Sequence, residues 1–133
     1  MEKGLSYFDL AENDYQFILK DKKEGRVGNI MCSAAQNICE RYLKHMIDTY
    51  VLDCDTTRIL QTYSLRFLRR FIQEQIPEFE GNWKVILQAD GYYFSTRYPG
   101  DGAFIVGKED VEECWEAVEE TREAVRKYLE SQK

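Results

Sequence analysis

The only histidine of the chain, His45, follows Arg41 by four residues, which places the two side chains on the same face of a helix, one turn apart. An imidazole steered by a neighbouring cation can serve as a general acid or base. The other interpretation is a half-buried histidine that fills the flank of its helix. We favour this second interpretation, because nothing else in the sequence completes a catalytic site around His45.

Arginines alternate with aromatic residues in the segment before Pro77. Arg66 and Arg70 are one turn apart, with Phe67 and Phe71 interleaved. Such a stripe could contact phosphate groups over a core of aromatic rings. The alternative, which we favour, is a solvated face that pairs with the acidic last helix.

A loop at residues 95–102 contains a third candidate. Arg97 could hold a phosphate or pin local backbone carbonyls, and the sequence leaves both interpretations open. Tyr98 and the aromatic run at 92–94 could stack on bases. We favour a role for these rings in sealing the core or contacting a second copy of the chain.

Signatures of metal, cofactor or phosphate-loop chemistry are absent from the sequence. It contains no GK[ST] triplet, no GxGxxG, no HExxH and no CxxC pair. We therefore expect neither a metal site nor a bound cofactor. Three of the four cysteines lie beside apolar helical positions, where we expect buried, reduced thiols; these are Cys32, Cys39 and Cys114.

Composition indicates a single all-α domain over residues 1–133. The chain is 44% hydrophobic and 32% charged, as in globular proteins. It has only 8 glycines and 2 prolines, with neither between residues 29 and 76, which is hard to reconcile with a turn-rich β sandwich. The net charge of -6 argues against broad electrostatic binding to nucleic acid or to an anionic membrane.

Apolar periodicity predicts an up-and-down bundle of four or five helices. We expect helices over residues 5–22, 27–50, a third segment capped by the turn at 53–56 and ending before Pro77, 83–93, and 108 to 131. The sequence shows no targeting segment, and the longest uncharged run, residues 27–39, is too short to cross a bilayer. We expect a cytoplasmic protein without a membrane partner.

Four segments, taken in order, resemble the HEPN domain (higher eukaryotes and prokaryotes nucleotide-binding). Asp9-Leu10-Ala11 with Asp14 is similar to that family's "DL..A..D", and residues 32–44 resemble its "hhAhQaaEKhLKA" run. Tyr63-Ser64-Leu65 stands where relatives show "HSL". Thr96-Arg97-Tyr98-Pro99, followed by Asp101, resembles the "TRYPD" loop. The resemblance covers residues 5–129.

The resemblance implies a small helical bundle that is usually dimeric. Members of the family cleave RNA, act beside a minimal nucleotidyltransferase, often as toxin–antitoxin pairs, or bind nucleotides. The ribonucleases carry an Arg followed by His after four to six residues, whereas Arg41 and His45 are separated by only three. Tyr63 also stands where relatives often have His.

We therefore predict a non-catalytic homodimer that binds a nucleotide or a nucleotidyltransferase-type partner. Phosphate would be held by Arg97, with Arg66 and Arg70 as further candidates, and the predicted fourth helix with its loop would form the dimer surface. Two alternatives stay open: a ribonuclease that uses Arg41 and His45, and a purely structural protein-interaction dimer.

Overall fold

The structure is a computed structural model in which residues 4–96 and 98–133 are described, with the side chain of Phe94 left out. The described residues contain helices and no strand, so the predicted all-α class is confirmed. The helices are α1 (Tyr7–Lys23), α2 (Asn29–Tyr50), α3 (Leu65–Gln75), α4 (Trp83–Ile86), α5 (Tyr92–Ser95) and α6 (Lys108–Ser131), with short 3-10 turns η1 (Ile59–Gln61) and η2 (Leu87–Ala89).

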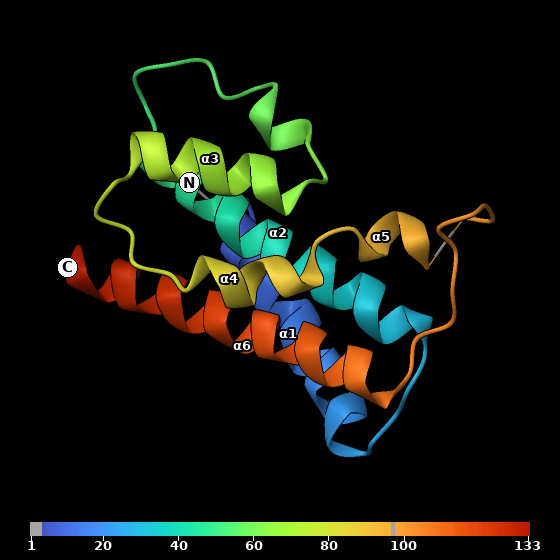
Figure 1. The fold of residues 1–133 in the computed structure, drawn as a ribbon. Coiled ribbons are helices and arrows are strands. Elements are labelled where there is room, and N and C mark those ends of the chain that lie inside the picture. The colour runs from blue at the N-terminus through green and yellow to red at the C-terminus, as the bar shows by residue number, and fades with distance from the viewer. Residues whose placement is uncertain (1–3, 97) are drawn as a thin grey trace.

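Helix α2 lies at the centre of the bundle and contacts α1, α6, α3 and α5 (Figure 1). It buries residues around most of its circumference, as expected of a helix with neighbours on several sides. Its fully buried side chains include Ile38, Tyr42, Leu43, Met46 and Ile47. The position of α2 means that any polar side chain on it must find a partner on another element.

The ends of α1 and α6 follow from local capping. Ser6 caps α1, because its hydroxyl accepts a hydrogen bond from the Asp9 amide at 3.1 Å while the Asp9 carboxylate accepts from the Ser6 amide at 2.9 Å. The amide of Gly107 donates to Asp110 at 2.8 Å in the same way at the start of α6. Both helices therefore lie close to their predicted ranges, and the bounds of α6 agree with the prediction.

The predicted third helix is wrong at its N-terminal half. Asp55 accepts from the Thr57 amide in a local turn, η1 follows, and the chain is extended at Thr62 before α3 begins. The Ser64 hydroxyl accepts from the Phe67 amide at 3.3 Å, so Ser64 is the N-cap of α3 and the turn at 53–56 is not.

The predicted fourth helix over 83–93 is also wrong as one continuous helix. It divides into α4 with η2, and then α5, because Asp90 is extended and Gly91 has a φ of 89°. The Asp90 carboxylate accepts a hydrogen bond from the Leu65 amide at 2.8 Å, so the break places a second cap on the start of α3.

All four cysteines are free, and Cys32, Cys39 and Cys114 are buried as predicted. Burial raises the pKa of the Cys39 thiol to about 12. No helix in the described part of the chain has an apolar stretch long enough to cross a membrane.

Candidate functional site

Three polar side chains form a buried row along one face of α2. Gln36, Glu40 and Lys44 are spaced four residues apart, and they are 1%, 7% and 5% exposed. We call these three residues the α2 polar row. Buried polar groups must be hydrogen-bonded to be tolerated, so the partners of each member indicate what the row does.

Gln36 joins two tyrosine-bearing segments that are distant in the sequence. Its amide nitrogen donates to the Tyr63 carbonyl at 2.7 Å, and its amide oxygen accepts from the Tyr93 backbone amide at 2.5 Å. The rings of Tyr63 and Tyr93 consequently stack, with 5.0 Å between centroids and an interplanar angle of 5°. We call this pair the tyrosine stack. The exposed ring of Tyr98 lies 6.3 Å from that of Tyr93.

Glu40 and Lys44 form a buried ion pair, with Lys44 Nζ donating to Glu40 Oε2 at 2.9 Å. Lys44 Nζ also lies 5.8 Å from the centroid of the Tyr63 ring. The second carboxylate oxygen, Glu40 Oε1, is buried without a hydrogen-bond partner among the described residues. Burial raises the pKa of Glu40, and the hydrogen bond from Lys44 opposes that rise.

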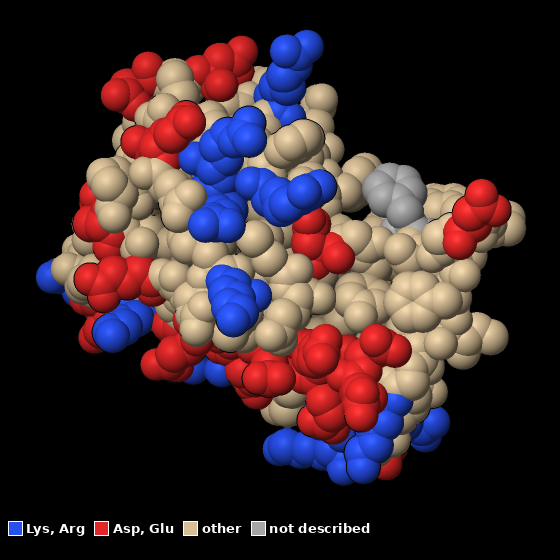
Figure 2. Space-filling model, in the orientation of Figure 1, with Lys and Arg blue, Asp and Glu red and all other residues tan. Residues whose placement is uncertain are grey.

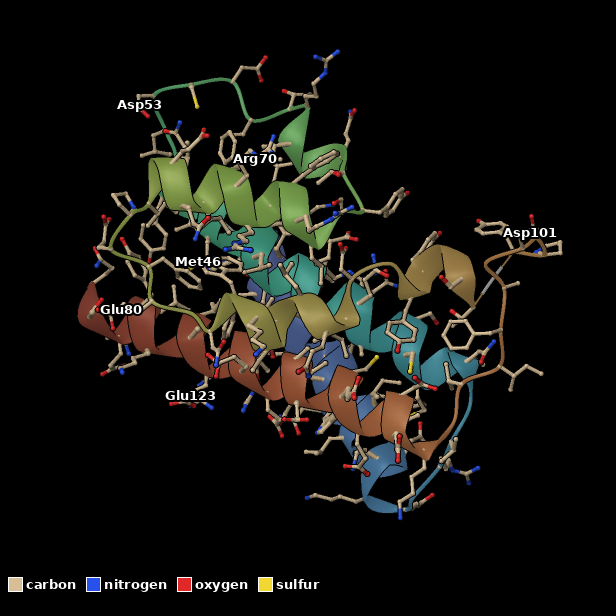
Figure 3. All side chains as sticks on the ribbon, in the orientation of Figure 1. Met46, Asp53, Arg70, Glu80, Asp101 and Glu123 are labelled. Atoms are coloured by element: carbon tan, nitrogen blue, oxygen red, sulfur yellow. The ribbon has the colours of Figure 1, made fainter. Side chains whose placement is uncertain are left out.

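The start of α3 supplies a cation close to the tyrosine stack. Arg66 follows Tyr63 by three residues, is mostly exposed, and lies 3.5 Å from the Asp90 carboxylate. Arg70 is exposed one turn further along α3, as Figure 3 shows. Figure 2 shows basic side chains gathered over α3 and a hollow between α3 and the arm that carries α5.

The arginines of α3 do not pair with the acidic last helix. In residues 4–96 and 98–133, the only ion pair that they form is Arg66 with Asp90. The predicted pairing is therefore wrong, because Asp90, from the break between η2 and α5, takes that place. Arg69 Nε is buried and has no acceptor among the described residues.

Asn29, at the first turn of α2, holds the loop that follows α5. Its side chain donates to the carbonyls of Thr96 at 3.3 Å and Phe104 at 3.0 Å, and accepts from the Val106 amide at 2.8 Å. The Thr96 hydroxyl donates to the Tyr92 carbonyl at 2.5 Å. Both ends of the loop are therefore tied to the bundle.

The structure describes some of the remaining candidate residues of this loop. Arg97 lies outside the described residues. Pro99 and Asp101 are exposed, and Figure 3 places Asp101 at the tip of the loop, far from Arg70 on α3. The structure therefore does not bring Asp101 and Arg70 together.

Arg41 and His45 are each held by α1. Arg41 forms an ion pair with Asp14. The His45 ring lies 5.5 Å from the Phe8 ring, and its nitrogens lie 3.4 Å from the Thr49 hydroxyl. Burial lowers the pKa of His45. These contacts agree with the packing interpretation of His45.

Sequence reasoning assigned no role to Gln36, Glu40 or Lys44, although they fall within the run that resembles the HEPN family. The signal that could have found them is their spacing, since polar residues at every fourth position in an apolar helix share one buried face. No comparable signal marks Asn29, whose partners are 67 to 77 residues away.

Taken together, the site offers stacked aromatic rings, a buried acceptor beside a buried ammonium, and an arginine at its edge. These groups are suited to holding a flat, polar and anionic molecule. In the described residues, no three His, Cys, Asp or Glu side chains lie close enough to hold a metal ion.

The family model of the HEPN domain matches residues 5–128. No curated protein and no solved structure shows significant similarity to the chain.

Proposed function

The chain belongs to the HEPN domain family, and on that premise we propose that it is a non-catalytic module that binds a nucleotide. The observation that carries the proposal is the tyrosine stack, which Gln36 holds by two hydrogen bonds directly beside the buried Glu40–Lys44 pair. Aromatic rings held in place before binding lose little freedom when a base stacks on them.

The phosphate of the nucleotide would be bound by arginines at the edge of the site. Arg66 supports this role best, because it is exposed and only three residues from Tyr63. Arg70, one turn further along α3, is exposed as well. Arg97 remains the third candidate on the strength of the sequence motif.

Calorimetric titration with nucleoside 5′-monophosphates tests the proposal. We expect Tyr63→Ala to weaken binding by about tenfold, because one ring–base stack contributes roughly that much. Arg66→Ala and Arg97→Ala should weaken binding while leaving the unfolding temperature unchanged. Arg126→Ala on α6, also exposed, is the matched control. Absence of binding by the unaltered protein at millimolar nucleotide would disprove the proposal.

The homodimer is part of the same proposal, and exposed apolar residues at the start of α2 and in the segment before α6 support it. Ile30 at the start of α2 is 77% exposed and Ile105 in the loop before α6 is 87% exposed. Phe104 and Tyr98, in the same loop, are 42% and 53% exposed. Of these residues, Tyr98 lies within the predicted surface, and the others extend it. Such residues are typical of a contact surface. Sedimentation equilibrium should show a dimer that Ile105→Asp dissociates; a monomeric unaltered protein would contradict this.

Two further parts of the proposal rest on family membership and on the sequence. A nucleotidyltransferase-type protein is the partner that we propose for the dimer, and copurification from the native host would identify it. The cytoplasmic location is proposed from the reduced thiols.

A further inference from the structure

The unpaired oxygen of Glu40 is the least explained atom of the candidate site. The Glu40 side chain is 9% exposed, and Lys44 occupies only one of its two carboxylate oxygens. Glu40 Oε1 is buried and accepts no hydrogen bond within residues 4–96 and 98–133. A buried charged acceptor that lacks a donor is costly, so its retention calls for a donor that the described chain does not supply.

Lys44 has N–H donors that find no acceptor among the described residues beyond the one oxygen of Glu40. Its ammonium group carries three N–H donors, and the single side-chain hydrogen bond of Lys44 in the described structure goes to Glu40 Oε2. The Glu40–Lys44 pair therefore presents an acceptor and a donor side by side. Both groups project from one face of α2, next to Tyr63, whose ring lies 5.8 Å from Lys44 Nζ.

We propose that Glu40 and Lys44 form the base-recognition end of the nucleotide site and select a nucleobase that carries an exocyclic amino group next to an unprotonated ring nitrogen. Adenine and cytosine are such bases. Glu40 Oε1 accepts a hydrogen bond from the amino group, and Lys44 donates to the ring nitrogen. This inference rests on the proposed nucleotide-binding function and specifies which ligands that function concerns.

The same geometry rejects the corresponding oxo bases. In hypoxanthine and uracil, a carbonyl oxygen replaces the amino group and the neighbouring ring nitrogen is protonated. The carbonyl would then face the Glu40 carboxylate, and the ring N–H would face the Lys44 ammonium. The first contact would place two acceptors opposite each other, and the second would place two donors opposite each other. In a buried site, such mismatched polar groups discriminate strongly between ligands.

The first experiment needs only the unaltered protein. Calorimetric titration compares adenosine 5′-monophosphate with purine riboside 5′-monophosphate, which lacks the amino group, and with inosine 5′-monophosphate. We expect adenosine monophosphate to bind roughly tenfold tighter than the purine riboside compound, since a hydrogen bond to a charged group contributes about that factor. The inosine compound should bind more weakly still, and cytidine monophosphate should bind tighter than uridine monophosphate.

A variant tests whether Glu40 is the source of the selection. Glu40→Gln places an amide where the acceptor was; if the amide oxygen stays on Lys44, its NH2 group faces the amino group of the base. The preference for adenosine over purine riboside monophosphate should then disappear, while binding of the purine riboside compound stays unchanged. Glu116→Gln, an exposed carboxylate on α6, is the matched control and should keep the full preference.

The outcomes separate this inference from the function on which it rests. Equal affinity of the unaltered protein for all three purine compounds overturns the inference and leaves nucleotide binding intact. A preference that survives in Glu40→Gln also overturns it, because another group would then read the base. Absence of binding to any of these nucleotides overturns both proposals. Since the ligand series uses the unaltered protein, poor folding of the variant does not affect that result.

Discussion

Helix α2 carries polar side chains into two buried environments, and only one of them is complete. On one side, Tyr42 donates to Glu12 at 2.7 Å, and Arg122 holds both oxygens of Glu12 at 2.8 and 3.2 Å. Arg122 also lies 4.1 Å from the Tyr15 ring centroid, and Tyr15 donates to Glu119 at 2.8 Å. We call these five residues the α1–α6 polar network.

On the other side lies the α2 polar row, where Glu40 keeps one oxygen unpaired. Both regions are ionic and partly or fully buried, yet in the network each carboxylate oxygen of Glu12 has a partner. The pKa of Glu12 reflects this, because burial raises it but the hydrogen bonds from Arg122 and Tyr42 outweigh burial and hold it below its ordinary value. The pKa of Glu40 is raised, with burial as the larger cause.

The difference teaches how to separate structural from functional polar groups in this protein. A network that the chain completes by itself joins helices and stabilises the fold. A row that the chain leaves incomplete is the better place to expect a ligand.

The largest expected effect comes from breaking the complete network. Arg122→Met keeps the apolar stem over Tyr15 but leaves Glu12 with Tyr42 as its only remaining donor among the described residues. We expect the free energy of unfolding to fall by about 2–3 kcal/mol, because a half-buried carboxylate loses its counterion. Urea denaturation measures this. Arg126→Met on the exposed face of α6 should change the stability little; an equal loss there would contradict the distinction.

A somewhat smaller loss of stability is expected at Gln36, the member of the α2 polar row whose amide nitrogen and oxygen both have a hydrogen-bond partner. Gln36→Leu removes the hydrogen bonds to Tyr63 and Tyr93 and should cost about 2 kcal/mol of unfolding free energy. The near-ultraviolet circular dichroism of the tyrosine rings should change at the same time. Gln16→Leu, exposed on α1, serves as the control. An unchanged tyrosine signal would show that Gln36 does not hold the stack.

Replacing the incomplete Glu40–Lys44 pair should raise the free energy of unfolding rather than lower it. We expect the double variant Glu40→Leu/Lys44→Met to be more stable by about 1 kcal/mol, since apolar residues often pack better than a buried ion pair whose groups are not all satisfied. The corresponding Glu12→Leu/Arg122→Met variant should be less stable, because it also removes the acceptor of Tyr42. Loss of stability in both double variants would erase the contrast between the two regions.

The smallest effect concerns pH and His45, which faces α1. Burial lowers the pKa of His45 below 6.5, while the charges of Asp48 and Asp9 oppose this. The unfolded chain therefore takes up the proton first, so the contribution to stability is complete above about pH 6.5 and declines as the pH falls. Between pH 7 and 5, the unaltered protein should lose more stability than His45→Gln in urea denaturation. Parallel pH profiles would contradict the assignment.

The helices whose ends depend on neighbouring residues could be predicted from the sequence. α6 combines apolar spacing with an acidic first turn, and α1 starts at a Ser6–Asp9 box, so both signals lie within a few residues of the helix end. The prediction failed at two boundaries that apolar periodicity does not mark. Ser64 caps α3, and the Leu65 amide donates a second hydrogen bond to Asp90, 25 residues away. Within the predicted helix over 83–93, the extended Asp90 and the positive φ of Gly91 interrupt the helix.

The candidate site shows the same division. The family motif contained Gln36, Glu40 and Lys44, and the spacing put them on one face, but nothing local indicated that Gln36 would bind the backbones of Tyr63 and Tyr93, 27 and 57 residues away. Arg66 was predicted as a cation that could contact phosphate, whereas its ion pair with Asp90 depends on how α3 and α5 approach α2.

The amino-acid sequence by itself determined the helical class, the family, the buried thiols and most of the helices, because helical periodicity and capping act over about four residues. Only the tertiary structure decided which polar groups are satisfied. Glu12 and Glu40 are both acidic residues on helices, and the sequence does not distinguish them. Arg122, from the far end of the chain, reaches Glu12, and no described residue reaches Glu40 Oε1, because a hydrogen bond between elements exists only where packing brings donor and acceptor within about 3 Å.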